Sequence, residues 1–159
     1  MGAAHKIKII VVDRTRLPFL KEGQDLYLER LSRYASIQWI EIKPTPIKKG
    51  VPPQHVLDEE AKAIYKKIKP DDYVIAMDKG GTIYTSEQFA QHLGQLIQHG
   101  RSVLFLIGGP LGIAKELLET AHEKISISSM TFTHEWCRVL LLEQIYRAFT
   151  ILRGEKYHK

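Results

Sequence analysis

The sequence predicts an α/β protein in which a mostly parallel β-sheet is flanked by helices on both faces. Short apolar segments and longer amphipathic segments alternate five times along the chain, a pattern typical of successive strand and helix units. The run 103–107, Val-Leu-Phe-Leu-Ile, is apolar throughout, which favours a strand buried on both sides of the sheet. With 159 residues, of which 44% are hydrophobic and 26% charged, the chain is expected to form a single domain, which we place at 6–159.

The first part of the chain is predicted to contain two strands, a helix and a proline-rich loop. Residues 1–5 show no pattern and are expected to be disordered or a cloning remnant, and 6–12 form the first predicted strand. Apolar residues recur at helical spacing over 19–34, which predicts an amphipathic helix, and a second strand is predicted at 37–42. The loop 44–53 contains four prolines, which disfavour regular structure, and we expect it to be mobile.

The middle of the chain is predicted to contain a helix, a strand and a second helix. The helix at 56–68 ends before a proline, because the residue that precedes proline disfavours helical backbone angles. The strand at 73–77 is expected to end in a turn at 78–81, where two glycines are adjacent. Thr85 is followed three residues later by a glutamine, and this capping-box pattern predicts a helix over 85–99.

The strand 103–107 ends in the loop Gly-Gly-Pro-Leu-Gly at 108–112, which we interpret as a ligand loop. The first two glycines lack a Cβ atom that would block a ligand or forbid positive φ, and a predicted helix at 113–121 directs its free N–H groups at the loop. A tight strand-to-helix turn without a ligand is the alternative interpretation. A fifth strand at 125–128 and a long helix at 134–152 complete the pattern.

Three strand ends are expected to lie at one edge of the sheet, where open parallel sheets bind their ligands. These ends are 77–78, 108–109 and 128–132, and if their strands are neighbours they form one pocket with apolar walls and backbone hydrogen-bonding groups. Such a pocket suits a small molecule with a flat ring and a polar tail. The loop lacks the G-x-G-x-x-G spacing of dinucleotide-binding proteins and the Gly-Lys-Ser/Thr of P-loop NTPases, so neither class is predicted.

Composition and charge narrow the class of protein further. The chain has no run of eighteen apolar residues and no apolar secretory segment at its N-terminus, so we expect a cytoplasmic protein that does not enter a membrane. The single cysteine, Cys137, excludes an internal disulfide, and the histidines have no spacing that indicates a metal site. The net charge of +5 admits a polyanionic partner such as RNA without requiring one.

Several motifs together carry a resemblance to a known family. They are Phe-Leu-Ile-Gly-Gly-Pro-x-Gly at 105–112, Ile-Ser-Ser-Met-Thr at 127–131, His134, Arg138, Glu-Gln-x-Tyr-Arg-Ala at 143–148 and Tyr-His-Lys at 157–159. In this combination the chain resembles the small SPOUT-class methyltransferases of the ribosomal RNA pseudouridine-N3 type, over nearly its whole length from Lys6.

The resemblance implies a C-terminal trefoil knot and a homodimer whose active site lies at the subunit interface. It implies S-adenosylmethionine as the cofactor, and as the reaction the methylation of N3 of a pseudouridine in large-subunit ribosomal RNA, on the assembled ribosome. It further implies that the cofactor is bound by Met77, Gly108, Ile127, Ser128, Ser129, Met130, Thr131 and Phe132. These residues lie at the three strand ends that the predicted sheet topology, without use of the resemblance, places around one pocket.

Methylation of this weakly acidic nitrogen requires that it lose its proton, so a general base or cations that stabilise the anion are needed. The candidate catalytic residues are His134, Arg138, Tyr157 and His158. Four residues apart on one helix, His134 and Arg138 are expected to project together toward the pocket mouth. Our hypothesis is that Arg138 and the tail hold the RNA, while His134 or His158 assists deprotonation. The alternatives are that His134 is only a polar helix terminus and that Arg138 only pairs with a surface carboxylate such as Glu135.

The chain departs from the family pattern at two places, and one other function is an alternative. Val12-Asp13-Arg14 follows the first predicted strand, where many relatives have a Val-Gly-Lys-type turn. Thr133 stands where a proline usually precedes the motif histidine, which gives the cofactor loop more backbone freedom. The alternative function is a non-catalytic α/β module that binds a nucleotide or phosphate at 108–112 and associates with the ribosome, because helix N-termini bind anions readily.

Overall fold

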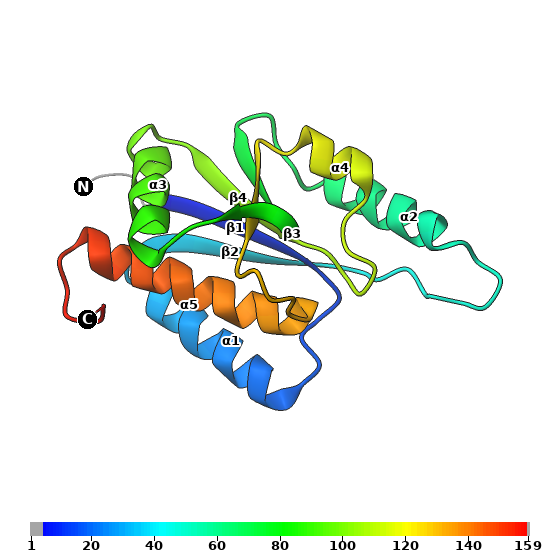
Figure 1. Ribbon diagram of the computed structural model, residues 1–159, viewed down its shortest axis with the longest axis horizontal. Coiled ribbons are helices and arrows are strands. Elements are labelled where there is room, and N and C mark those ends of the chain that lie inside the picture. The colour runs from blue at the N-terminus through cyan, green and yellow to red at the C-terminus, as the bar shows by residue number, and fades with distance from the viewer. Residues whose placement is uncertain (1–4, 159) are drawn as a thin grey trace.

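The computed structural model describes residues 5–158 and contains a five-stranded sheet flanked by helices (Figure 1). The elements in chain order are β1 (His5–Val12), α1 (Pro18–Leu31), β2 (Ala35–Ile42), α2 (Pro53–Tyr65), β3 (Asp72–Ile83), α3 (Ser86–Gln98), β4 (Ser102–Ile107), α4 (Lys115–Thr120), β5 (Glu123–Ser126) and α5 (His134–Leu152). The strands follow the order β2-β1-β4-β3-β5, and every neighbouring pair is parallel. The predicted α/β fold with a parallel sheet is therefore confirmed, whereas the trefoil knot and the single domain stay predictions.

Two helical layers cover the sheet, one on each face. α1, α3 and α5 pack on one face, and α2 and α4 lie on the other (Figure 1). Each layer encloses its own apolar core, and the residues of β4 alternate between the two cores. Val103, Phe105 and Ile107 face the first core, and Leu104 and Leu106 face the second. All five are at most 3% exposed, so the predicted burial of this strand on both faces is confirmed.

β3 differs from its prediction, because it continues to Ile83 instead of ending in a turn at 78–81. β5 pairs with it on both sides of a register shift that follows Met77. A Cβ atom on Gly81 would lie 2.6 Å from the backbone of Ile125, so only glycine lets β5 approach this closely. The predicted turn is wrong, and the glycine that suggested it marks the close approach of two strands.

The limits of other elements differ from the predictions by a few residues. His5 belongs to β1 and pairs with the first residue of β2, so its expected disorder is wrong, while residues 1–4 lie outside the described part of the chain. The helix predicted at 113–121 is reduced to the six residues of α4. β5 ends at Ser126, whose hydroxyl donates a hydrogen bond of 2.7 Å to a backbone carbonyl two residues later. The chain between 43 and 52 has neither helix nor strand, as predicted, and its mobility stays a prediction.

The longer helices begin where local signals in the sequence favour a helix start. α2 begins at Pro53, because proline lacks the N–H that a first helical turn would leave unpaired. Thr85 caps α3 through the predicted capping box, in which its side chain accepts from the N–H of Gln88 at 3.2 Å. α5 has the predicted limits. Within residues 5–158, no helix is both long and apolar enough to cross a lipid bilayer.

Candidate functional site

A cavity of about 740 Å³ lies where β4 and β5 end, beside the bulged part of β3. Its walls come from residues within 77–79, 107–113 and 125–134, which lie close together because β4, β3 and β5 are neighbours. The prediction that these three regions form one pocket is confirmed. The volume falls within the range of about 300–1,000 Å³ that is usual for small-molecule and cofactor sites.

Seven of the eight residues assigned to the cofactor line this cavity. They are Met77, Gly108, Ile127, Ser128, Met130, Thr131 and Phe132. Ser129 is absent from the cavity wall. Met130 and Phe132 are 76% and 44% exposed, so these two large apolar side chains lie at the solvent-facing rim. The structure thus brings the assigned residues together, while their contact with a cofactor stays a prediction.

The glycine loop needs glycine first of all for its own fold. A Cβ atom on Gly108 would lie 2.3 Å from the carbonyl oxygen of Gly112, and Gly112 has a φ of +84°. The N–H of Gly112 donates to the carbonyl of Gly109 at 2.9 Å, which closes the loop on itself. Positive φ occurs at Gly112 and not at the first two glycines of the loop. α4 contributes no residue to the cavity, and the expected role of its N–H groups is wrong.

Thr133 lies on the cavity wall directly before α5 and has a φ of −64°. A proline would impose nearly the same angle, about −65°. Within residues 5–158, the backbone N–H of Thr133 makes no hydrogen bond that a proline would remove. The departure from the family pattern therefore leaves the path of this loop unchanged.

His134 is the first residue of α5 and lines the cavity. Burial of the imidazole, followed by the nearby Arg138 cation, lowers the pKa of His134 below its usual value. The ring is therefore neutral near neutral pH and has a free nitrogen that can accept a proton. Its position and charge state are compatible with a general base.

The helical spacing predicts that Arg138 lies at the pocket mouth, and this prediction is wrong. Its side chain is fully buried, with Nη1 donating to the hydroxyl of Thr15 at 3.0 Å and Nη2 donating to the carbonyl of Val12 at 2.6 Å. Its Nε is buried and has no hydrogen-bond partner within the described residues. The alternative of a surface pair is wrong as well, since Glu135 accepts instead from the backbone N–H of Arg16. A guanidinium in this position cannot contact RNA directly, and it ties α5 to the end of β1.

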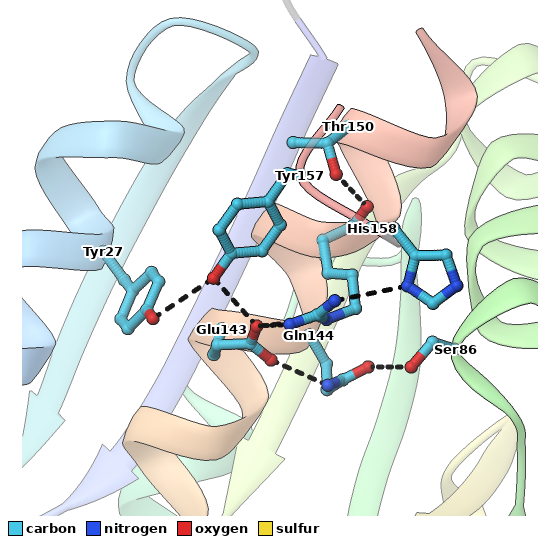
Figure 2. Close-up of polar contacts among 8 residues, drawn as sticks. Tyr27, Ser86, Glu143, Gln144, Thr150, Tyr157 and His158 are labelled. Carbon is cyan, nitrogen blue, oxygen red and sulfur yellow. Dashed lines mark hydrogen bonds and ion pairs between the residues drawn. The ribbon is translucent and has the colours of Figure 1, made fainter. Parts of the chain in front are cut away.

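The tail residues Tyr157 and His158 lie against α5, away from the cavity wall (Figure 2). The hydroxyl of Tyr157 donates to Glu143 at 3.1 Å. The His158 ring lies between Arg147, at 3.2 Å from Nδ1, and Glu87, at 2.7 Å from Nε2. Burial and hydrogen bonds to its neighbours raise the pKa of the Tyr157 phenol, so this hydroxyl stays protonated and remains a donor.

The four candidate catalytic residues do not form one cluster within a single chain. His134 is at the start of α5, whereas the tail contacts this helix at Glu143. Nine residues of helix separate these two positions, which is roughly 14 Å along the axis. Lys159, the last residue of the tail motif, lies outside the described residues.

The sequence patterns did not predict that residues of the motif 143–148 contact the tail. Glu143, Gln144 and Arg147 are polar residues of α5 that are only partly buried, and their grouping within 143–147 of the helix is the signal that was available. Cys137 also lines the cavity, but burial raises its pKa to about 11, so it is a thiol and not a nucleophile. Within residues 5–158, no three His, Cys, Asp or Glu side chains are grouped so as to hold a metal ion.

Sequence comparison identifies relatives over nearly the full chain. A family model described as "Predicted SPOUT methyltransferase" matches residues 5–158. A protein of Carboxydothermus hydrogenoformans named "Ribosomal RNA large subunit methyltransferase H" is 42% identical over 158 residues, covering 97% of this chain and 99% of that protein. A protein of the same name from Bacillus pumilus is 41% identical over 157 residues, covering 96% and 99%.

Solved structures agree with the fold. A protein of Neisseria gonorrhoeae described as a methylase family protein has a TM-score of 0.56 and 13% identity, with 89% of this chain and 82% of that chain covered. A similarly described protein of Haemophilus influenzae has a TM-score of 0.55 and 14% identity, covering 96% and 68%. At this level of identity the likeness concerns the fold alone, and the sequence matches carry the assignment. The chain therefore belongs to the SPOUT methyltransferase family.

Proposed function

We propose that this protein transfers a methyl group from S-adenosylmethionine to large-subunit ribosomal RNA. The observation that carries the proposal is the cavity at β3, β4 and β5, which has the volume of a cofactor site and contains seven of the residues assigned to the cofactor. The relatives named as ribosomal RNA methyltransferases match this chain nearly from end to end, which supports the same class of substrate.

The cavity suits S-adenosylmethionine better than a phosphate-rich nucleotide. Met77, Ile107 and Ile127 offer apolar side chains to a flat adenine ring, and 108–112 offers backbone groups to the polar substituents. In the described chain, Lys79 is the only lysine or arginine on the cavity wall, whereas phosphate sites combine cations with helix N-termini. This lining disfavours the non-catalytic phosphate-binding module.

The chain's own task in the reaction is to position the RNA and to remove a proton. The bound cofactor supplies an electrophilic methyl group, and transfer requires the acceptor nitrogen to be held in line with it. His134, neutral and at the cavity, is the base that we propose for the N3 proton. Arg138 lowers the pKa of this histidine from its buried position, so its role is to tune the base. Tyr157 and His158 are the groups that we propose for contact with the RNA.

A homodimer completes this site, because the tail of one chain lies roughly 14 Å along α5 from the cavity of the same chain. Exposed apolar side chains near the cavity support such an interface. Phe19 and Trp136 are 56% and 42% exposed, and their rings contact each other with centroids 5.7 Å apart. Met130 and Phe132 at the cavity rim add to this apolar surface. We propose that a second copy covers it and brings its own tail to the cavity.

The finer substrate that we propose is N3 of a pseudouridine in the assembled ribosome, and it rests on the family resemblance. The chain has a net charge of +5, and its five-stranded domain fills the described residues, so isolated RNA is expected to bind weakly. Specificity then comes from the shape of the folded ribosome. A ribosomal substrate also agrees with the predicted cytoplasmic location.

Calorimetric titration with S-adenosylhomocysteine, with ATP as the comparison ligand, tests the cofactor. We expect binding of S-adenosylhomocysteine alone. The folded protein binding ATP and not S-adenosylhomocysteine would overturn the methyltransferase proposal in favour of the phosphate-binding module.

Methylation of unmodified ribosomes, followed by mass spectrometry of the digested ribosomal RNA, tests the substrate. We expect one N3-methylated pseudouridine, formed much faster on ribosomes than on a free stem-loop oligonucleotide. A methyl group on another nucleoside, or equal rates on both substrates, would contradict the finer proposal while leaving the cofactor assignment intact.

A further inference from the structure

The carboxylate of Glu143 accepts several of the hydrogen bonds that link the tail to α5. Its Oε1 accepts from Nη2 of Arg147 at 2.7 Å, from Nε of the same side chain at 3.1 Å, and from the hydroxyl of Tyr157 at 3.1 Å. Its Oε2 accepts from Nε2 of Gln144 at 2.7 Å, and the oxygen of that amide accepts from the hydroxyl of Ser86 at 2.8 Å. Figure 2 shows this chain of contacts, which runs from the tail across α5 to the first residue of α3.

The tail aromatic is fixed by the groups that Glu143 holds. The Arg147 guanidinium lies over the Tyr157 ring, 4.8 Å from its centroid, and the same guanidinium contacts Nδ1 of His158. Tyr146 meets the Tyr157 ring edge-on, with centroids 4.8 Å apart. Because an arginine only donates, its contact requires a lone pair on Nδ1 of His158 and leaves Nε2 to donate to Glu87. Glu143 therefore contacts Tyr157 directly and His158 through Arg147, while Glu87 holds the other side of the His158 ring.

The same contacts reach the region of the cofactor. Ser86 and Gln144 line a second cavity, of about 190 Å³. This second cavity shares Met77 and three consecutive residues of the β5 region, 125–127, with the larger cavity. The contacts of Glu143 therefore connect the tail on one side with the wall of the second cavity on the other.

An ordinary surface ion pair would not have these properties. Glu143 and Arg147 are four residues apart on a helix, where exposed pairs are common and weak. Here the two side chains are only 18% and 25% exposed. The carboxylate also accepts hydrogen bonds from Gln144 and Tyr157, besides those from Arg147. Replacing the carboxylate by an amide removes the charge and places an NH2 group opposite donors, so the tail loses its fixed position.

We propose that Glu143 is a positioning residue for methyl transfer, holding Tyr157 and Arg147 in the arrangement with which the tail meets the RNA. This inference rests on the proposed function. Glu143 does not line the large cavity and bonds to Tyr157, so in this proposal it acts through the tail.

The test is a double-mutant cycle of Glu143→Gln and Tyr157→Phe, with single-turnover methylation of ribosomes as the readout. We expect Glu143→Gln to lower the rate roughly 10- to 100-fold, the effect of slightly misplacing a reacting group. Affinity for S-adenosylhomocysteine, measured by calorimetry, is expected to stay unchanged. The loss of rate in the double variant should be smaller than the product of the two single losses, because both changes break the contact between Glu143 and Tyr157.

Two further variants serve as a matched control and as a variant that keeps the charge. Glu59→Gln is the matched control, because it removes a carboxylate from another helical ion pair, with Lys62 at 2.7 Å, and should leave the rate unchanged. Glu143→Asp keeps the charge and should restore part of the rate. It also replaces Glu143→Gln in the cycle if that variant loses its fold, as circular dichroism would show.

Three outcomes separate this inference from the proposed function. A wild-type rate in Glu143→Gln, or losses in the two single variants that multiply fully in the double variant, overturns the positioning role while the function stands. Lost affinity for S-adenosylhomocysteine in a folded Glu143→Gln overturns it as well, since the effect would lie in the cofactor site. A wild-type protein that binds no S-adenosylhomocysteine and methylates no ribosome overturns the function and this inference together.

Discussion

The large cavity and the C-terminal tail are built in different ways. The cavity is made largely of backbone and apolar side chains at the ends of neighbouring strands, so strand order alone fixes its place. The tail is held by side-chain contacts, with Tyr157 bonded to Glu143 and His158 bonded to Glu87. The place of the cavity therefore follows from the sheet, whereas the position of the tail depends on a few polar and charged groups.

This difference assigns different tasks to the two regions. A preformed cavity can bind a cofactor without rearrangement, and changes in its wall should appear as changes in affinity. A tail fixed by hydrogen bonds can orient a substrate, and changes there should appear as changes in turnover while affinity for the cofactor is kept. Variants in each region can confirm or break this division.

Gly108→Ala is expected to have the largest effect, because the new Cβ atom would lie 2.3 Å from a backbone oxygen of the same loop. We expect a loss of stability of about 1–3 kcal/mol, as for an overpacked core, together with loss of S-adenosylhomocysteine binding in a calorimetric titration. Gly109→Ala is the milder comparison in the same loop, since its Cβ atom would meet only side-chain atoms, those of Val12 at 3.3 and 3.5 Å and that of Glu60 at 3.8 Å. Full affinity in Gly108→Ala would mean that the loop is not part of the cofactor site.

A heterodimer of two impaired variants tests whether each active site combines the cavity of one subunit with the tail of the other. His134→Ala impairs the cavity side and Tyr157→Phe impairs the tail. Co-expressed with different affinity tags and purified as heterodimers, they should regain methylation well above that of either homodimer, because one of the two sites is then intact. No recovery in a verified heterodimer would place cavity and tail of the same copy in one site and require the tail to move.

The cavity and the tail also differ in how well they could be predicted from the sequence. The order of elements, the burial of 103–107 and the pocket at three strand ends were predictable, because they follow from hydrophobic pattern and main-chain topology. The burial of Arg138 was not, since its partners Thr15 and Val12 are more than 120 residues away in the sequence. The contact of His158 with Glu87, 71 residues away, escaped for the same reason, because a contact between distant side chains leaves no periodic signal.

Gly81 shows a second limit of sequence patterns. A pair of glycines reads as a turn, yet the structure uses the second one to let two strands approach each other. A glycine in the sequence indicates that a Cβ atom is not tolerated at that position, but it does not indicate which neighbouring atoms exclude it. The same holds for Gly108, where atoms of its own loop exclude a Cβ atom.

Arg138→Met should affect both stability and the pH dependence of the reaction. Loss of the guanidinium leaves the acceptors on Thr15 and Val12 unpaired, partly offset by the relief of a buried charge, and we expect a cost of about 1–3 kcal/mol in urea unfolding. Arg138 lowers the pKa of His134, while Glu135 and Asp13 raise it, so this substitution raises that pKa. A base works in its neutral form, so single-turnover rates of the variant should fall at higher pH than those of the wild type when the solution is acidified.

An acidic limb of the rate profile that stays in place in a folded Arg138→Met protein would show that His134 is not the base. A shift of that limb to lower pH would contradict the charge argument itself. Arg138→Lys is the control for charge, because lysine keeps a cation near the histidine while losing the paired geometry of the guanidinium.

Thr133→Pro is expected to have the smallest effect, and it tests the rigidity of the cavity directly. Thr133 already has a φ of −64°, and proline would fix this angle while removing freedom only from the unfolded chain. We expect a gain of about 0.4–1 kcal/mol in urea unfolding and unchanged affinity for S-adenosylhomocysteine. Weaker binding in a stabilised variant would mean that the loop must move to admit its ligand, and the contrast between a preformed cavity and an adjustable tail would then fail on the side of the cavity.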